Sequence, residues 1–364
     1  MSKELKVAFI GGGINSAVGQ AHKIALQMDG NFELVAGCFS RDAETNFRTA
    51  EAWGVDSKRV YETYNELLSL EKGRLDAVLV LTPTPSHKEI VVECLMSGFL
   101  VVCEKSLAMS VREAEEIKAC MDRYKGKLVV TYNYSGYPML RELRERIRRG
   151  QLGKLEQILI EMPQEGFSRL NNQGAPHIPQ SWRLKDHSIP TLSLDLGVHL
   201  HQIINFLSQE KPLEVIGFQS HFGNFKEVVD NVHCLASYTN GLVCNIWYGK
   251  TAFGYRNGLR IRVFGTEGAA EWLQMTPERL VFSDNKGRQF ILDRASSDNI
   301  VANEKRYNRF KVGHPAGFIE AFANYYHDVA DFIRSSGADT GNVFGLELAL
   351  EGLEMLERLH KKHF

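Results

Sequence analysis

The sequence has few of the features that mark membrane, disulfide-rich or nucleic-acid-binding proteins. Its six cysteines stand at positions 38, 94, 103, 120, 234 and 244, without the paired spacing typical of zinc ligands or redox motifs. No apolar run approaches the roughly 18 residues of a membrane helix. The net charge is only -1, which gives no electrostatic reason to expect nucleic acid or an anionic membrane as a partner. We therefore expect a cytoplasmic protein with reduced thiols, no bound metal, and neither nucleic acid nor membrane as its partner.

What is present is the composition of an ordinary globular protein. Hydrophobic residues make up 44% and charged residues 24% of the 364 positions, which is enough chain for two domains. The most basic stretch runs from Arg141 to Arg149 and is interrupted by Glu142 and Glu145. This alternation of charge predicts a solvated helix face.

The first third of the chain alternates short apolar runs with helical patterns. Strands are expected at residues 6–10, 32–38, 76–81, 100–103 and 127–131. Gly54 is placed to end one helix, Ser86 to cap another, and Ser110 with Glu113 forms a capping box. Strands and helices that alternate in this way predict a doubly wound parallel sheet.

After this region the strands follow one another directly. From about residue 155 to 293 they are interrupted by one helix near 192–207, and Asn240-Gly241 is a strong two-residue hairpin signal. A long polar stretch occupies 163–190, and two amphipathic helices are expected at 315–335 and 342–361. The sequence thus predicts an α/β protein with two domains. Residues 1–131 are expected to form a Rossmann domain, and residues 132–364 an α+β domain for substrate binding and oligomerisation, with a large, mostly antiparallel, open-faced sheet and carboxyl-terminal helices that pack back.

The first candidate site is a glycine turn. The strand Lys6–Ile10 leads into Gly11-Gly12-Gly13 and then into a helix. Backbone N–H groups at such a helix start point at a nucleotide pyrophosphate, and the missing Cβ atoms allow its close approach. A tight turn without a ligand is the alternative interpretation.

The second candidate is Lys105, which follows the strand 100–103. In an open parallel sheet, ligands bind beyond the carboxyl ends of the strands, so Lys105 is expected in the same crevice as Gly11 and Gly13. There it could hydrogen-bond a substrate hydroxyl or transfer a proton. The alternative is a surface lysine beside Glu104.

The third candidate is the pair Asp195 and His199. Positions i and i+4 share one face of a helix, and a carboxylate beside an imidazole suits a general base. Gln202 falls on the same stripe. The alternative is a capping aspartate with a partly buried histidine. His199 and His201 diverge on a helix, so they do not suggest a metal site.

With these residues in view, the chain resembles the Gfo/Idh/MocA oxidoreductases, the glucose–fructose oxidoreductase and inositol dehydrogenase family, over essentially its whole length. The Glu-Lys-Pro motif of the family matches Glu104-Lys105-Ser106, and its Asp-x-x-x-His motif matches Asp195 and His199. The other marks are the glycine turn, Thr82-Pro83-Thr84-Pro85-Ser86-His87, and Trp182-Arg183.

The sequence departs from the family pattern at four places, one of which is Pro190-Thr191-Leu192-Ser193 in place of a glycine-rich entry to the helix with Asp195 and His199. Ser16 stands where the third dinucleotide glycine is usual, and Ser106 replaces the proline after Lys105. Gln202 replaces an acidic residue that often follows the histidine. The change at Gln202 puts the identity of the substrate in question more than the type of reaction.

The resemblance implies hydride transfer between a nicotinamide and a secondary alcohol of a sugar, cyclitol or sugar derivative, possibly nucleotide-activated. His199 would take the hydroxyl proton, Asp195 would orient its imidazole, and Lys105 would donate to the same oxygen. Dinucleotide contacts are expected from Gly11, Gly13, Ile14, Asn15, Ser40, Arg41, Thr82, Pro83, His87, Glu104 and Lys105. Substrate contacts are expected from Tyr132, Asn133, Trp182 and Arg183, under a loop formed by 163–190.

Two further questions stay open from the sequence. Ser40 and Arg41 at the end of the second strand could hold the 2′-phosphate of NADP, whereas Asp42 could bind the ribose of NAD; we favour NADP slightly. A dinucleotide-binding regulator, or an enzyme that recycles its nicotinamide internally, is the alternative to a dehydrogenase. The open sheet face suggests a homodimer or homotetramer.

Overall fold

The computed structural model describes residues 3–338 and 341–361, and the chain forms two compact units. The first unit comprises Met1–Asn133 and Phe318–Leu350, and the second comprises Tyr134–Gly317 and Glu351–Phe364. These units are sets of residues in mutual contact. The division into domains 1–131 and 132–364 stays a prediction about what folds independently.

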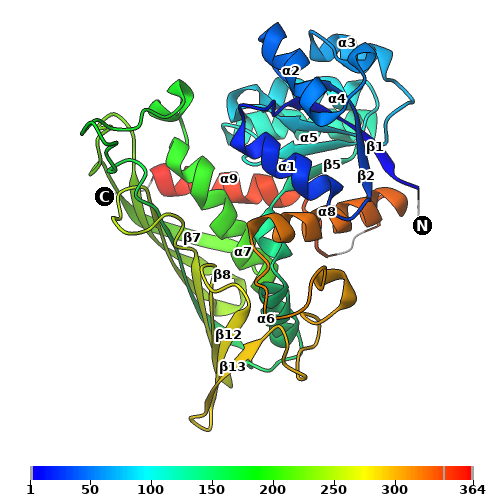
Figure 1. Ribbon diagram of the computed structural model, residues 1–364. Helices are drawn as coiled ribbons and strands as arrows, with labels where there is room; N and C mark the ends of the chain where they lie inside the picture. The colour runs from blue at the N-terminus through cyan, green and yellow to red at the C-terminus, as the bar shows by residue number, and fades with distance from the viewer. Residues whose placement is uncertain (1–2, 339–340, 362–364) are drawn as a thin grey trace. The chain divides into compact units, whose positions relative to one another are not determined.

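The first unit is built on a parallel sheet of five strands in the order β2-β1-β3-β4-β5, the doubly wound arrangement predicted from the alternating pattern. The strands are β1 Leu5–Gly11, β2 Phe32–Cys38, β3 Ala77–Leu81, β4 Val101–Glu104 and β5 Leu128–Thr131. The helices are α1 Ala17–Gln27, α2 Ala43–Trp53, α3 Tyr64–Leu70, α4 His87–Met96, α5 Val111–Tyr124 and α8 Phe318–Arg334. Helices α1 and α8 pack together beside this sheet, as Figure 1 shows in blue and orange.

Two of the predicted helix ends are confirmed and one is wrong. Ser110 accepts from the N–H of Glu113 at 3.2 Å, and Gly54 ends α2 in the left-handed conformation at φ 70°. Ser86, however, does not cap α4 with its side chain. Its hydroxyl donates to the carbonyl of Pro83 at 2.9 Å, because a 3₁₀ turn over Thr84–Ser86 precedes the helix and brings that carbonyl within reach.

The carboxyl-terminal part of the chain returns to the first unit. The N–H of Val130 in β5 donates to the carbonyl of Phe344 at 2.8 Å, and the Tyr325 hydroxyl of α8 donates to the Val130 carbonyl at 2.6 Å. Helix α9 (Leu346–Lys361) starts in this unit, and its residues from Glu351 onward belong to the second one. Segments far apart in the sequence therefore complete the edge of the parallel sheet at β5.

The second unit is built on an eight-stranded sheet in the order β13-β12-β11-β10-β6-β9-β8-β7. All neighbours pair antiparallel except β6 and β9, which run parallel with Glu161 opposite Trp247. The strands are β6 Leu155–Pro163, β7 Pro212–Ser220, β8 Asn231–Tyr238, β9 Val243–Gly249, β10 Arg260–Gly265, β11 Gly268–Leu273, β12 Arg279–Asp284 and β13 Gln289–Asp293. The predicted hairpin between β8 and β9 is confirmed, with positive φ at Asn240 and Gly241.

The two faces of this sheet differ in what lies over them. Helices α6 (Pro138–Arg148) and α7 (Val198–Ser208) lie on one face, over a buried layer that includes Ile246 and Trp272. In Figure 1 both helices lie on the same side of the broad green-to-yellow sheet. On the opposite face, large apolar side chains are exposed, so the open-faced sheet predicted from the sequence is confirmed.

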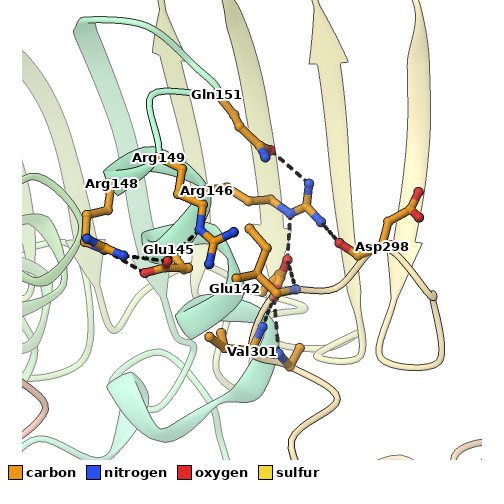
Figure 2. Close-up of polar contacts among 10 residues, drawn as sticks. Glu142, Glu145, Arg146, Arg148, Arg149, Gln151, Asp298 and Val301 are labelled. Atoms are coloured by element: carbon orange, nitrogen blue, oxygen red, sulfur yellow. Dashed lines mark hydrogen bonds and ion pairs between the residues drawn. The ribbon is translucent and has the colours of Figure 1, made fainter.

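The predicted solvated face of the helix at 141–149 is wrong in its central positions. Glu142 is fully buried, and its carboxylate accepts from the backbone N–H groups of residues 300–302 and from Arg146 at 2.7 Å (Figure 2). Arg146 also donates to the carbonyl of Asp298 at 2.6 Å. Only Glu145 with Arg148 and Arg149 forms ion pairs with exposed arginines. The acidic and basic residues of this helix alternate because one set of ion pairs is buried against a loop and the other set faces water.

Within the described part of the chain, no helix is long and apolar enough to cross a membrane.

Candidate active site

The glycine turn after β1 has the geometry of a cradle for phosphate. Gly11 and Gly12 have φ of 81° and 71°, a region that other residues rarely adopt. A Cβ atom at Gly11 would lie 2.7 Å from Cγ2 of Thr82, and one at Gly13 would lie 3.1 Å from the carbonyl of Phe39. The backbone of this turn is thus pressed against the segments that follow β2 and β3.

The sequence does not reveal which residue allows α1 to pack so closely. Ser16, at the usual third glycine, is the N-cap of α1 and accepts from the N–H of Gly19 at 3.1 Å. The close approach occurs at Gly19, where a Cβ atom would lie 1.8 Å from the carbonyl oxygen of Gly12. Gly19 therefore takes the packing role expected of the third glycine, and Ser16 stabilises the start of the helix.

The ends of β3 and β4 form the neighbouring edge of the same sheet. His87 is buried and its two ring nitrogens lie 2.7 Å from the carbonyl oxygens of Thr82 and Ser106. Burial lowers the pKa of His87, although these two hydrogen bonds oppose it. The histidine thus ties the segment after β3 to the segment after β4, where a cis peptide bond joins Lys105 and Ser106. By joining these two segments, His87 supports the predicted dinucleotide site.

Lys105 follows β4 directly and is half-buried, and Glu104 before it is buried. The Glu104 carboxylate contacts Nε2 of His22 at 3.0 Å and the hydroxyl of Thr131. Burial raises the pKa of Glu104, but the hydrogen bonds from His22 and Thr131 and the nearby charge of Lys105 outweigh it and leave the pKa below its usual value. Glu104 is therefore a carboxylate at neutral pH.

At the end of β2, the candidate residues for the adenosine ribose are exposed or half-exposed. Asp42 is the N-cap of α2 and accepts from the N–H of Thr45 at 2.8 Å, which lowers the pKa of its carboxyl group. Ser40 accepts from the N–H of Asp42 at 3.1 Å, and Arg41 is exposed beside them. Asp42 thus has a structural role at this position.

These residues fit a dinucleotide. The turn at Gly11 to Gly13 is formed by glycines whose positions leave no room for a Cβ atom against the segments that follow β2 and β3, as described above. Within the described residues, the buried hydroxyl of Thr82 and the buried amide nitrogen of Asn133 have no hydrogen-bond partner. Buried polar groups without a partner are rare in proteins, so these atoms indicate positions where a bound ligand supplies one.

In the second unit, the centre of the site is the carboxylate of Asp195. Its Oδ2 atom lies 2.5 Å from Nζ of Lys250 and 2.8 Å from Nη1 of Arg183. Lys250 follows β9 and lies 5.1 Å from the ring centroid of Phe167, and the Arg183 guanidinium lies over the ring of Trp182. Two cations thus share one mostly buried carboxylate.

The helix that carries Asp195 and His199 is not regular. Residues Ser193–Gly197 form a π-helical turn, and α7 starts at Val198. Such turns are frequent at functional sites. His199 is buried, with its ring edge-on to Tyr134 at a centroid distance of 4.8 Å. The predicted orientation of His199 by Asp195 assumed α-helical spacing and stays a prediction.

Gln202 lies one turn beyond His199 and is fully buried. Among the described residues, neither its amide oxygen nor its amide nitrogen has a hydrogen-bond partner. A buried amide that lacks both partners is costly unless a ligand provides a donor and an acceptor. Gln202 is thus a stronger candidate for substrate binding than its difference from the family pattern alone suggested.

The 163–190 segment is largely irregular, as predicted, but several contacts fix its ends. Phe167 donates through its N–H to the carbonyl of Lys250 at 2.8 Å. Asp186 accepts from the N–H groups of Thr191 and Val229. Trp182 and Arg183 lie in a 3₁₀ turn over Ser181–Leu184, so the ion pair of Arg183 joins this segment to Asp195.

Of the predicted residues, the structure brings Gly11, Gly13, Thr82 and His87 together within the first unit, with Tyr132 buried just after β5. Arg183 and Asp195 meet within the second unit. Lys250 was missed. Its only signal is that an isolated lysine ends an apolar strand, and its position depends on the parallel pairing of β6 with β9.

The fold and the glycine turn define an α/β protein with a Rossmann sheet and a separate, mostly antiparallel sheet. The GFO/IDH/MocA profile described as an oxidoreductase family with an NAD-binding Rossmann fold matches residues 5–132, and the family's C-terminal domain profile matches residues 140–271. The chain belongs to the GFO/IDH/MocA oxidoreductase family, which confirms the resemblance seen in the sequence.

Individual relatives agree with this assignment. The chain is 30% identical to the uncharacterized oxidoreductase YfiI of Bacillus subtilis, over 98% of this chain and 94% of that protein. It is 24% identical to inositol 2-dehydrogenase of Rhizobium meliloti, over 74% of this chain and 77% of the relative. An inositol dehydrogenase homolog from Azotobacter vinelandii, solved with NADH and myo-inositol, superposes with a TM-score of 0.89 at 26% identity, covering 100% of this chain and 96% of that one.

Proposed function

We propose that this protein is an NAD(P)-dependent dehydrogenase that oxidises a secondary alcohol of a sugar, cyclitol or sugar derivative. The family assignment supports oxidoreductase chemistry, and relatives named for inositol support a polyhydroxylated substrate. The observation that carries the substrate class is the buried amide of Gln202, which has neither a donor nor an acceptor partner among the described residues. A polyol offers both from a single hydroxyl group.

The bound nicotinamide supplies the hydride acceptor at C4. In this proposal, His199 takes the proton of the reacting hydroxyl group, and Lys105 donates a hydrogen bond to the oxygen as negative charge develops on it. Asp195, held by Lys250 and Arg183, orients His199. Tyr132, Asn133 and Trp182 contact substrate hydroxyls, and the 163–190 segment excludes water.

For the cofactor, we propose that Ser40 and Arg41 hold the 2′-phosphate of NADP. The capping role of Asp42 supports this preference, because its carboxylate is engaged with α2. Two related structures contain NADH and NAD+, so NAD is the alternative to be compared in the same assay.

We further propose that the chain assembles as a homodimer or homotetramer through the open face of the eight-stranded sheet, in the cytoplasm. Ile216, Phe218, Leu235 and Val243 project from this face, and register places Ile216 opposite Leu235. At the centre of the face, Arg260 pairs with Glu271 at 2.8 Å. An apolar patch beside paired charges suits a self-complementary contact.

The experiment is a panel of free sugars, cyclitols, sugar phosphates and nucleotide sugars, each assayed for reduced-nicotinamide formation with NAD and NADP in parallel. Lys105→Ala is expected to lower kcat by about 100- to 1000-fold, the usual effect of removing one donor to a developing oxyanion. Lys58→Ala, at an exposed lysine of the same unit, is the matched control.

Turnover that disappears in Lys105→Ala and survives in Lys58→Ala supports the dehydrogenase and names the substrate class and cofactor. Dinucleotide binding without turnover on any member of the panel contradicts it, and favours a dinucleotide-dependent regulator. Cofactor that stays bound through purification, with a product that shows no net oxidation, favours internal recycling of the nicotinamide.

A further inference from the structure

Two buried polar side chains on α2 have no role in the reaction steps proposed above. Asn46 and Thr49 are three residues apart, so they lie on the same face of the helix. Asn46 is 2% exposed and Thr49 has no exposed surface. Burial of a polar side chain is costly unless it is hydrogen-bonded, so the partners of these two residues indicate what this face of α2 does.

Asn46 holds the segment that follows β2. Its Oδ1 atom accepts from the N–H of Phe39 at 2.7 Å and from that of Ser40 at 3.4 Å. Its Nδ2 atom donates to the carbonyl of Tyr61 at 2.8 Å. The amide group thus fixes the backbone directly before Arg41, in the segment proposed above to bind the 2′-phosphate.

Thr49 holds the glycine turn. Its hydroxyl group accepts from the N–H of Ile14 at 3.1 Å and donates to the carbonyl of Thr45, one turn back in α2, at 2.6 Å. Gly13 lies against the same hydroxyl group, since a Cβ atom there would be 3.1 Å from Oγ1 of Thr49. The turn is therefore fixed from the side of α2 as well as from the side of α1.

Phe39 connects these two sets of contacts. Its carbonyl accepts from the N–H of Gly13 at 3.2 Å, while its own N–H donates to Asn46. Its ring lies edge-on to Phe9 and Trp53, with centroids 6.5 and 5.5 Å away. The glycine turn, the end of β2 and α2 are therefore joined by hydrogen bonds, and α2 contacts both of the other two.

We propose that Asn46 and Thr49 are positioning residues for the dinucleotide: Thr49 holds the turn for the pyrophosphate, and Asn46 holds the 39–42 segment that distinguishes NADP from NAD. Both act through the backbone that they hold. A segment that is already fixed discriminates better than a mobile one, because it loses less conformational entropy when it binds. The proposal rests on the cofactor site of the proposed function, and it does not rest on turnover of a substrate.

The competing explanation is that both side chains only satisfy buried backbone groups and so stabilise the first unit. Loss of either would then lower the free energy of unfolding and leave the affinity of the folded protein for NADH and NADPH as it was. Dissociation constants measured well below the unfolding transition report on the folded protein alone. These constants therefore separate the two explanations.

Four variants and one control test the two roles. Asn46→Leu fills the volume of the amide and removes its hydrogen bonds, and Asn46→Ala takes its place should Asn46→Leu fail to fold. Thr49→Val removes only the hydroxyl group, whereas Thr49→Ser keeps it. Glu51→Leu, at an exposed carboxylate on the same helix, is the matched control.

The readout is the fluorescence of NADH and of NADPH, each titrated with every variant. In Asn46→Leu, the ratio of the two dissociation constants is expected to move toward one by about three- to tenfold, the range that the loss of one hydrogen bond covers. In Thr49→Val, both constants are expected to rise by that same factor with their ratio unchanged, because the pyrophosphate is common to both cofactors. In Thr49→Ser and Glu51→Leu, both constants are expected to stay within about twofold of the unaltered protein.

Unchanged constants in Asn46→Leu and Thr49→Val would overturn the proposal. An unchanged ratio in Asn46→Leu, or equal affinity of the unaltered protein for NADH and NADPH, would overturn the role given to Asn46, because the 39–42 segment would then distinguish nothing. A loss in Thr49→Ser as large as in Thr49→Val would overturn the role given to the Thr49 hydroxyl. The titration needs no substrate, so dinucleotide binding without turnover contradicts the proposed dehydrogenase and leaves this test readable.

Discussion

At the scale of single residues, Asp195 shows that charged residues outside a sequence motif can be part of its site. Its carboxylate receives two cations, of which Arg183 was predicted near the site and Lys250 was not. Lys250 is mostly buried, with its ammonium group over the ring of Phe167 and paired with Asp195. The aspartate of the family motif is therefore fixed in place before any substrate arrives.

Removing Lys250 should therefore loosen Asp195. We expect Lys250→Met to lower kcat about tenfold, a loss of roughly 1.4 kcal/mol in transition-state stabilisation, because the carboxylate proposed to orient His199 loses one of the two cations that hold it. Steady-state kinetics on the substrate found in the panel measures this, with exposed Lys185→Met as the matched control. Full activity in Lys250→Met would show that Asp195 stays in position without Lys250.

Gly19 is a second residue whose role depends on a single atom. A Cβ atom there would overlap the carbonyl of Gly12 at 1.8 Å. We expect Gly19→Ala to push α1 away from the glycine turn and to weaken dinucleotide binding by more than about tenfold, since the phosphates are proposed to bind to the helix start and the turn together.

Fluorescence titration with NADH and NADPH measures this loss. Ser16→Gly is the matched control: it places a glycine at the position usual in the family and removes a cap, which costs only a few tenths of a kcal/mol. Dinucleotide affinity that is unchanged in Gly19→Ala would show that the turn tolerates the displacement of α1.

At the scale of elements, α6 shows that a charged helix can use buried ion pairs and hydrogen bonds to hold a loop. Glu142 accepts from three consecutive backbone N–H groups and from Arg146, as Figure 2 shows, and so holds the loop at residues 298–302. Arg148 and Arg149, one turn further on, pair with Glu145 with their own side chains in water. The helix thus contains one buried and one exposed set of ion pairs.

These two sets should differ in their effect on stability. Glu142→Gln is expected to lower the free energy of unfolding by about 3 kcal/mol, because Arg146 loses its buried partner. Arg148→Ala is expected to change it by less than about 1 kcal/mol, as is usual for exposed pairs. Urea denaturation of both variants measures the difference, and equal midpoints would contradict it.

The comparison of these elements shows what the sequence can reveal. The parallel strands, the glycine turn and the Asn240-Gly241 hairpin were predicted because each depends on neighbouring residues. The burial of Glu142, the position of Lys250 and the contact of His22 with Glu104 were not, because each depends on pairing across the fold. His22 and Glu104, for instance, are 82 positions apart, and no local pattern marks them as partners.

At the scale of the whole molecule, the open sheet face exposes large apolar side chains that a partner subunit would cover. Phe218 is 60% exposed and Leu235 is 51% exposed, on adjacent strands. We expect the protein to elute in light-scattering chromatography with a mass that is a multiple of the 41.1 kDa chain. The double substitution Phe218→Asp and Leu235→Asp should reduce it to a single chain, because charge is costly in an apolar contact.

Dinucleotide binding should survive in that variant, since the glycine turn belongs to the other unit. Ile24→Asp, which changes an exposed apolar residue on α1, is the matched control and should leave the mass unchanged. A single-chain mass for the unaltered protein at low concentration would contradict the proposed assembly.

The return of residues 318–350 to the first unit has a consequence for how the protein is made. The contact of β5 with Phe344 and the contact of His22 with Tyr326 on α8 cannot form until those later residues have been synthesised, which happens after the whole second sheet. At a synthesis rate of about 5 to 20 residues per second, the nascent Rossmann sheet spends roughly 10 to 40 seconds without them. During that interval the edge of the parallel sheet at β5 is incomplete, and we expect this edge to be the part of the nascent chain that most needs protection by a chaperone.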